Sequence, residues 1–233
     1  MKICVFGLPE IPRGKCNVKD PRLDEADRLV EAKKKTYAQM DVVDESDLVT
    51  SDAVLTNPDG FLELLFKDHE FIETRLSRDP GDAEKAALLK LKAQFEAEKT
   101  ALTAELSPED RQALTIHSFH TSKPVVVATQ AELADIDALL LRAFKEAGYI
   151  TFLTVGGKEN RAWAIRAGTS AWDAAGTIHT DIQKGFIRAE IIAWEDFSAN
   201  GGETGAKRAG KQRLELKTYV MQDCDVVNFR FNK

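Results

Sequence analysis

Two apolar stripes at helical spacing, separated by a strong turn, most constrain what this 233-residue chain can fold into. The first stripe consists of Leu62, Leu65, His69, Ile72 and Leu76, and the second of Leu88, Leu91, Phe95 and Leu102. Between them, the sequence Arg-Asp-Pro-Gly-Asp at residues 78–82 breaks a helix. Because each helix buries its stripe against the other, residues 60–119 are predicted to form an antiparallel helical hairpin, a coiled-coil arm. Such arms also serve as docking surfaces.

Buried strands flank the predicted arm on both sides. Apolar runs that fit short strands lie at Ile3–Phe6, Tyr37–Val43, Asp52–Thr56 and Pro124–Ala128. Continuous β-branched runs of this kind are typical of a parallel sheet. Asp20 followed by Pro21 predicts one helix and residues 132–147 predict another, whereas the Gly- and Pro-rich residues 7–20 predict a loop. Residues 1–59 and 120–150 are therefore expected to form one small α/β domain.

The pattern changes at Thr151 to short strands separated by Gly-rich turns. The expected strands are Thr151–Val155, Arg161–Ile165, Ile187–Ala193, Lys217–Met221 and Val226–Phe231. Residues 201–210 predict a short helix that is capped near Asn200 and ends in a cluster of Lys and Arg. Residues 151–233 are therefore expected to form a separate, small, β-rich domain.

Charge is unevenly distributed along the chain, whose net charge is −6. Residues 151–233 carry 12 Lys and Arg against 10 Asp and Glu, whereas residues 1–150 carry 20 against 28. An acidic front half argues against DNA binding and against general coating of nucleic acid, since phosphate contacts need clustered cations. The mildly basic back half still allows a local contact with RNA.

Cysteine, histidine and hydropathy patterns limit the other classes of function. Three distant cysteines favour a reducing cytoplasm over a disulfide framework. His117 and His120 have no second pair of ligands near them in the sequence, so no metal site is expected. No apolar run reaches the ~20 residues of a membrane-spanning helix, and the apolar stretch at the start is too short for a signal peptide.

The C-terminal segments resemble the YchF (Obg-like) ATPases. The similar stretches are TFLTVGGKENRAWAIRAGTSAWDAAGTIHTDIQKGFIRAEIIAWEDF, GAKRAGKQR and YVMQDCDVVNFRF, which together cover most of residues 151–233. The resemblance implies a TGS-like domain, a β-grasp in which a twisted sheet grips a helix. One departure lies at Cys224, where the family has Gly. A turn that needs positive φ there strains a cysteine by about 1 kcal/mol.

The front half resembles the same family in fragments. The similar stretches are MKICVFGLP, VKDPRLDEADRLVEAKKK, TYAQMDVVDESDLV and HTSKPVVVATQAE. The family's first helix, its first switch and the catalytic stretch after the second switch have no counterpart between them. The resemblance therefore implies an α/β fold with a shortened P-loop-GTPase-like sheet, the helical arm and the C-terminal β-grasp domain.

The remnant of the phosphate loop departs from a working one at several positions. A P-loop, GxxxxGK[ST], cradles phosphates with backbone N–H groups, and its Ser or Thr binds Mg²⁺. Here six residues separate Gly7 from Gly14, and Cys16 stands in place of the hydroxyl. Pro21 follows Lys15 so closely that no long helix can begin at the lysine and direct its dipole at a phosphate.

Two further nucleotide motifs are altered in the same way. The family's DxxG motif is Asp44-Glu45-Ser46-Asp47 here, which places an additional acid near the expected γ-phosphate. The NxxE base-recognition motif is Thr129-Gln130-Ala131-Glu132, which lacks the asparagine. Nucleotide hydrolysis is therefore not expected, and no catalytic residue, metal or cofactor is assigned. The residues left for weak phosphate or nucleotide binding are Arg13, Gly14, Lys15 and Glu132.

These patterns leave three functional hypotheses open. The first is a non-catalytic protein whose TGS-like domain contacts RNA, the ribosome or a protein partner, as the resemblance implies. The candidate contact residues are Lys158, Arg161, Lys184, Arg188, Lys207, Arg208, Lys211 and Arg213. The second hypothesis is a residual ATP- or GTP-binding protein, or a triphosphatase with Mg²⁺ and an altered P-loop. The third is a regulator that competes with a full-length YchF relative.

Overall fold

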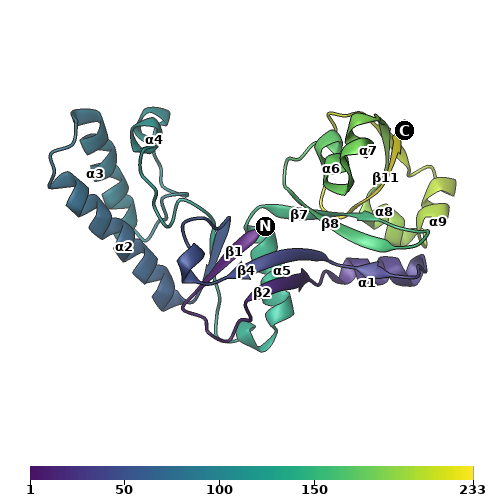
Figure 1. Cartoon of the computed structure of the whole chain (residues 1–233), viewed down its shortest axis with the longest axis horizontal. Coiled ribbons are helices and arrows are strands. Elements are labelled where there is room, and N and C mark those ends of the chain that lie inside the picture. Colours follow the sequence, from purple (N-terminus) through teal and green to yellow (C-terminus); the bar gives the residue numbers. More distant parts are fainter. Residues whose placement is uncertain (233) are drawn as a thin grey trace. The chain divides into compact units, whose positions relative to one another are not determined.

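The computed structural model describes residues 1–232, which divide into two compact units (Figure 1). Unit 1 contains residues 1–16 and 41–139. Unit 2 contains residues 17–40 and the described residues from 140 onward. Residues 17–40 therefore group with the C-terminal part of the chain, although they are close in sequence to the first strand.

The first sheet has five strands in the order β2-β4-β1-β5-β6. Its strands are β1 (Lys2–Phe6), β2 (Gly14–Val18), β4 (Ala38–Val43), β5 (Ala53–Thr56) and β6 (Val125–Val127). β1 pairs in parallel with both β4 and β5, and β5 pairs in parallel with β6. The predicted buried strands of the front half thus form the expected small parallel sheet, whose core includes Cys4, Phe6 and Val54.

The prediction of a loop throughout residues 7–20 is wrong for its second half. Residues 14–18 form the edge strand β2 beside β4, and only Val18 of this strand is buried. An edge strand needs one partner for its backbone and little apolar side-chain surface. The hydrophobic pattern therefore does not predict this strand, because its sequence Gly-Lys-Cys-Asn is largely polar.

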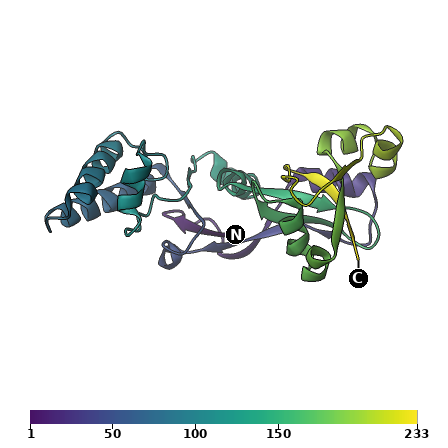
Figure 2. The same ribbon diagram turned by 90° about the horizontal axis from the view of Figure 1, so that it is seen from above.

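A helical arm fills most of the rest of unit 1. Its helices are α2 (Pro58–Leu76), α3 (Asp82–Glu96) and α4 (Pro108–Leu114), and two 3-10 turns, η1 (Glu45–Asp47) and η2 (Glu132–Ala134), lie elsewhere in the unit. Asn57 caps α2 by accepting a hydrogen bond from the Gly60 N–H at 2.7 Å, and Ser107 and Asp110 form a reciprocal capping box at α4. Figures 1 and 2 show α2 and α3 side by side, as the apolar stripes predict.

The core of the arm uses most, but not all, of the predicted stripes. Leu65, Ile72, Leu88 and Leu91 are at most 5% exposed and pack together with Phe95. Leu62 and Leu102 are instead exposed. The expectation that these two leucines are packed inside the hairpin is wrong, and α3 already ends at Glu96, so Leu102 lies beyond the second helix.

The second sheet has six strands in the order β10-β9-β11-β7-β8-β3 and belongs to unit 2. Its strands are β3 (Lys35–Thr36), β7 (Tyr149–Thr154), β8 (Asn160–Arg166), β9 (Phe186–Ile192), β10 (Arg213–Glu215) and β11 (Asp225–Phe231). β7 pairs antiparallel with β8 and parallel with β11, which is antiparallel to β9. This mixed sheet is the predicted β-grasp.

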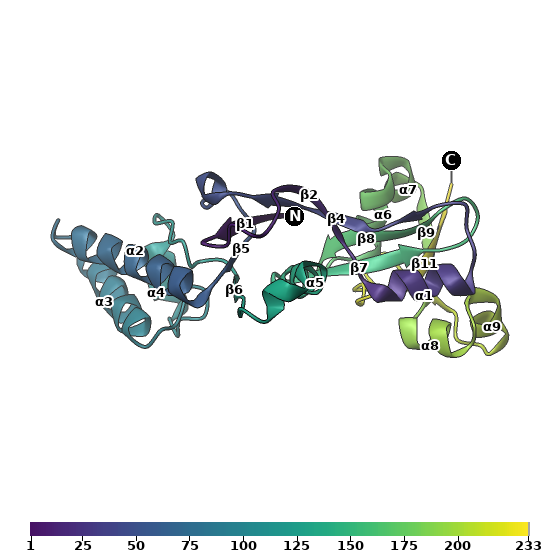
Figure 3. The same ribbon diagram turned by 90° about the horizontal axis from the view of Figure 1, so that it is seen from below.

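Helices cover both faces of the second sheet (Figure 3). The remaining helices are α1 (Pro21–Leu29), α5 (Ile136–Glu146), α6 (Ala171–Ile178), α7 (Thr180–Lys184), α8 (Trp194–Ala199) and α9 (Glu203–Arg208). α6 and α7 lie on one face, where small alanines of α6 pack on Phe152 and Phe229. α1 and α8 lie on the other face. α1 begins at Pro21 with Asp20 as its cap, as predicted.

One local prediction in unit 2 is wrong, and another is right except for its helix cap. Residues 217–221 form a single bridge between Ser170 and Val220 rather than a strand, because their backbone hydrogen bonds go to residues 169–172. The short helix predicted within residues 201–210 forms as α9 and ends in Lys207 and Arg208, but its N-cap is Gly202, which has a φ of 104° and offers no side-chain cap. In the sequence Asn-Gly-Gly at 200–202, the two glycines both have positive φ and form the turn before α9.

Over the described residues 1–232, no helix combines the length and the apolar character that crossing a membrane requires.

Candidate functional site

The loop after β1 occupies the position of a phosphate loop, and side chains already satisfy its backbone. The Gly7 N–H donates a hydrogen bond to Oε1 of Glu45 at 3.3 Å, and the Asn57 amide donates to the Gly7 carbonyl at 2.8 Å. Gly7 has a φ of 68°, a conformation that glycine adopts without strain. A carboxylate from the altered DxxG motif is thus bound to a backbone N–H of the kind that holds phosphate in P-loops.

The basic residues of this loop are directed elsewhere. The Arg13 guanidinium donates to the carbonyl of Leu8 at 3.3 Å and also to the carbonyl of Ile11, so it closes its own loop. Gly14 and Lys15 lie on strand β2, and α1 is the first α-helix after them, beginning at Pro21. The predicted absence of a helix N-terminus behind the lysine is therefore confirmed.

Glu132, the remaining acid of the base-recognition motif, closes a local turn on η2. Its Oε2 accepts hydrogen bonds from the Thr129 N–H at 2.9 Å and from the Thr129 hydroxyl at 2.8 Å. The structure therefore uses Thr129, which stands where the family has asparagine, to hold the acid in place.

A cavity of about 290 Å³ lies beside this loop. It is lined by Gly7, Leu8, Glu10, Asn57, Pro58, Asp59, Ala128, Gln130 and Leu133. These residues follow the carboxyl ends of the parallel strands β1, β5 and β6, which is where ligands bind in open α/β sheets. The two charged residues of the lining, Glu10 and Asp59, are both acidic, and none of the four predicted nucleotide-binding residues lines the cavity. An acidic, lysine-free cavity disfavours a triphosphate.

The acids of the second-switch remnant make local contacts. Asp44 caps η1 by accepting from the Ser46 N–H at 2.9 Å, and these contacts with Ser46 lower the pKa of the Asp44 carboxyl. Asp47 accepts from Lys2 and from the Thr50 hydroxyl, which lowers its pKa in the same way. Both carboxylates are therefore anchored to protein groups.

An ion-pair network in unit 2 joins α1 to the turn before β11. The Arg22 guanidinium donates to Asp20 at 2.6 Å and to Asp223 at 2.7 Å, and Lys145 lies 3.7 Å from Asp223. Asp223 also accepts from the Thr151 N–H at 3.2 Å. Burial by itself raises the pKa of Asp20, but the hydrogen bonds and charge of Arg22 outweigh it and hold that pKa below its ordinary value.

Cys224, which follows Asp223, has the positive φ expected from its place in a turn where the resembled family has Gly. Cys224 is fully buried with a φ of 66°, and its N–H donates to the Thr151 carbonyl at 2.7 Å. Burial raises the pKa of its thiol well above the ordinary range, so the sulfur is an inert packing group. The turn is therefore kept in a glycine-like conformation without a glycine.

The predicted cationic residues of unit 2 lie at separate places. Arg161 on β8 and Arg213 on β10 have the three strands β7, β11 and β9 between them, or roughly 19 Å at ordinary strand spacing. Lys207 pairs with Glu203 at 2.6 Å and Lys211 with Asp196 at 3.1 Å. The structure thus brings together the cations of the α9–β10 edge but does not gather all eight.

Among the described residues 1–232, carboxylate or aromatic partners are found for half of the predicted cations and not for the other half. Arg161 lies 3.9 Å above the ring of Trp163, and Arg213 lies 5.5 Å from the ring of Tyr219. Within residues 1–232, no ion pair is found for the exposed side chains of Lys158, Lys184, Arg188 and Arg208. These four are the cations most available to an anionic partner.

Comparison with known proteins shows which proteins the chain is similar to. A family model described as "YchF-GTPase_C: Protein of unknown function (DUF933)" matches residues 149–232. The ribosome-binding ATPase YchF of Bacillus subtilis (strain 168) is 33% identical over 236 aligned positions, which cover 73% of this chain and 64% of that protein. Residues 149–232 thus match the C-terminal domain of the YchF family, and the chain as a whole is similar to YchF proteins. The ribosome-binding ATPase YchF of Haemophilus influenzae is 46% identical over 128 positions, 47% of this chain and 35% of that protein.

A solved structure of the Schizosaccharomyces pombe YchF GTPase has the same fold. It superimposes with a TM-score of 0.75 at 19% identity, covering 99% of this chain and 97% of that one. The predicted fold class, an α/β sheet with a helical hairpin and a β-grasp module, is therefore confirmed. The chain spans 64% of the length of its Bacillus relative and 35% of its Haemophilus relative.

Sequence reasoning missed the Arg22 network. Asp20 was recognised as a helix cap, but its partner Arg22 pairs with Asp223, 201 residues further along the chain. The one signal that pointed to this turn was the departure from the YchF family at Cys224.

Proposed function

We propose that this chain is a YchF-family binding protein whose C-terminal module contacts the ribosome, through RNA or a ribosomal protein, without hydrolysing nucleotide. Relatives with the same module are called ribosome-binding ATPases, and the module is the best-matched part of this chain. The contact is assigned to the exposed cations Lys158, Lys184, Arg188 and Arg208.

The hydrogen bond from the Gly7 N–H to Glu45 carries the proposal that hydrolysis is absent. A bound phosphate would have to displace this carboxylate or lie against it, and two like charges in close contact repel. No helix dipole compensates, because Lys15 lies within strand β2. Cys16 offers no hydroxyl for Mg²⁺ at the position where a P-loop has Ser or Thr.

Calorimetric titration with ATP and GTP, with and without Mg²⁺, tests the absence of a nucleotide site. No heat of binding at millimolar nucleotide is expected from the wild-type chain. The variant Lys15→Ala is then indistinguishable from wild type. Micromolar, Mg²⁺-dependent binding that is lost in Lys15→Ala would overturn this part of the proposal in favour of an altered phosphate loop.

Co-sedimentation with purified ribosomes tests the contact itself. We expect nucleotide-independent binding that weakens as salt rises, since released counterions drive phosphate contacts. The double variant Arg188→Glu/Arg208→Glu should weaken binding at least tenfold. The matched double variant Lys85→Glu/Lys92→Glu, which reverses two charges on the arm, should not. Equal loss in both variants would contradict the assignment to the C-terminal module.

A further inference from the structure

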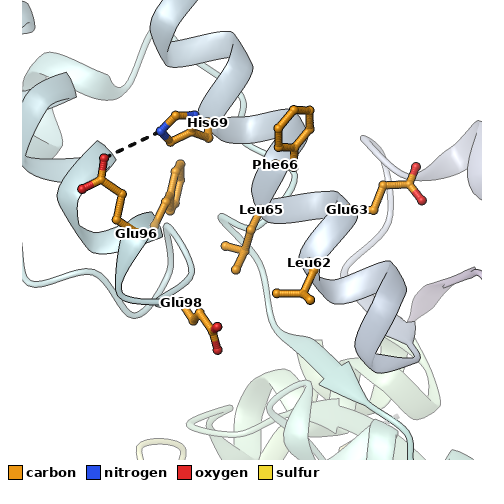
Figure 4. A pocket seen from close by; sticks show the side chains of 8 residues that line it. Leu62, Glu63, Leu65, Phe66, His69, Glu96 and Glu98 are labelled. Atoms are coloured by element: carbon orange, nitrogen blue, oxygen red, sulfur yellow. Dashed lines mark ion pairs between the residues drawn. The ribbon is translucent and has the colours of Figure 1, made fainter.

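An apolar groove lies along the helical arm, and none of the residues assigned to the ribosome contact or to the phosphate-loop remnant lines it. Its volume is about 610 Å³, and its apolar lining consists of Leu62, Leu65, Phe66 and Phe95. Figure 4 shows Leu62 and Leu65 projecting from α2 toward the end of α3, with Glu96 and Glu98 on the opposite side. The groove therefore lies between the first half of α2 and the end of α3.

The floor of the groove is fixed and its walls are exposed. Leu65 and Phe95 are each 5% exposed and belong to the core of the arm, so packing holds them in place. Leu62 and Phe66 are 50% and 66% exposed. Exposed apolar side chains gathered around one preformed cavity are typical of an interaction site, whereas single exposed ones are ordinary.

Carboxylates surround this apolar lining. Glu63, Glu96 and Glu98 border the groove, and the one other polar residue there is His69, whose Nε2 lies 3.9 Å from Glu96. Lys67 pairs with Glu63 at 2.7 Å. Within the described part of the chain, neither Glu96 nor Glu98 has a Lys or Arg ion-pair partner within 4 Å, although the charge of Lys92 acts on Glu96 from further away. Residues 60–119 as a whole carry 12 Asp and Glu against 8 Lys and Arg.

We propose that this groove binds a partner protein through a basic amphipathic helix, with two or three apolar side chains in the groove and Lys or Arg beside them. Residues 62–69 span about two helical turns, roughly 10 Å, which matches anchors at i, i+3 and i+4 of a docked helix. The carboxylates select cationic flanks and oppose nucleic acid, whose phosphates would face them. A second copy of this chain fits less well, because its net charge is also negative.

The proposal is independent of the ribosome contact, since none of the cations assigned to that contact lines the groove. Selection from a displayed library of random 16-residue peptides on the purified chain reads out the partner's chemistry directly. Prior depletion of the library on the variant Phe66→Ala removes peptides that bind elsewhere. We expect the selected peptides to be enriched in Leu, Phe, Lys and Arg and depleted of Asp and Glu.

Fluorescence anisotropy with the most enriched peptide, fluorescein-labelled, measures the contributions of the groove. Phe66→Ala should weaken binding at least tenfold, and Glu96→Gln/Glu98→Gln should weaken it about fivefold at low salt and less at high salt. The control Leu89→Ala removes a 51%-exposed leucine that lies outside the groove and should leave the Kd unchanged. Circular dichroism confirms that the variants fold.

Three results would overturn the proposal. The first is a selection that yields no peptides, or acidic ones. The second is labelled polyuridine RNA whose binding is lost in Phe66→Ala, which would assign the groove to nucleic acid. The third is a concentration-dependent dimer in sedimentation equilibrium that Phe66→Ala abolishes, which would assign it to a second copy of the chain.

Discussion

At the scale of single residues, one side chain strains its own backbone and another stabilises a neighbouring loop. Cys224 adopts a φ of 66° in a fully buried turn, and a side chain in the left-handed region costs about 1–2 kcal/mol. Lys123 donates three hydrogen bonds of 2.8 Å to the carbonyls of Leu48, Val49 and Ser51. Neither side chain is assigned to a ligand, and for each we predict how a substitution changes the free energy of unfolding.

We expect Cys224→Gly to be more stable than Cys224→Ala by about 1 kcal/mol. Both variants remove the buried thiol, so loss of packing is shared, and the difference isolates the cost of a Cβ atom at positive φ. Urea denaturation of the two variants measures it. Equal stabilities would show that the surrounding structure relaxes the turn.

Lys123→Met should lower the free energy of unfolding by about 2 kcal/mol, because it leaves three carbonyl groups without their charged donor. Burial lowers the pKa of this lysine, as it disfavours the charged form. The matched control is Lys85→Met, whose amine lies 3.8 Å from the exposed Asp79 and should change stability by under about 0.5 kcal/mol. Chemical denaturation measures both, and similar losses would contradict the anchoring role.

At the scale of elements, the sequence predicts those whose pattern is set by burial. The parallel strands, the hairpin arm and the strands β7, β8, β9 and β11 were recognisable because apolar residues mark them at periods of two or 3.6. Strand β2 and the bridge at Val220 were not recognisable in this way, because they are formed by backbone hydrogen bonds to neighbouring segments rather than by burial of apolar side chains. The missing features of the phosphate loop could be predicted from the sequence. The hydrogen bond between Gly7 and Glu45 could not, because it depends on tertiary structure.

The stability of the helical arm should depend on acid pH through Glu84. Hydrogen bonds from Arg75 at 2.6 Å and with His117 at 2.8 Å hold the pKa of Glu84 at about 2. Because this lies below an ordinary glutamate value of about 4.3, the stabilisation is complete above about pH 5 and is lost as pH falls toward 2. The Tm of wild type minus that of Glu84→Gln should therefore shrink over this range. A constant difference would contradict the assignment.

At the scale of the whole molecule, the division into units does not follow the order of the sequence. Residues 17–40 belong to unit 2, where β3 pairs with β8 and α1 lies on the second sheet. Local pattern could predict α1 and its cap, but not which sheet it covers. That depends on long-range contacts such as the pairing of Arg22 with Asp223 and of Asn160 with Asp27, which leave no trace in the local sequence.

Arg22 should therefore stabilise the C-terminal module although it lies in the first tenth of the chain. Arg22→Met leaves Asp20, which is 3% exposed, without its main partner, so we expect a loss of about 2 kcal/mol. Amide hydrogen exchange should show this loss in β7 and β11, whereas β1 in unit 1 keeps its protection. Arg28→Met, on the same helix and exposed, is the matched control and should change exchange little. If β1 lost protection to the same extent as β7, the network would be stabilising the whole chain as one cooperative body, and residues 17–40 would not belong to unit 2 alone.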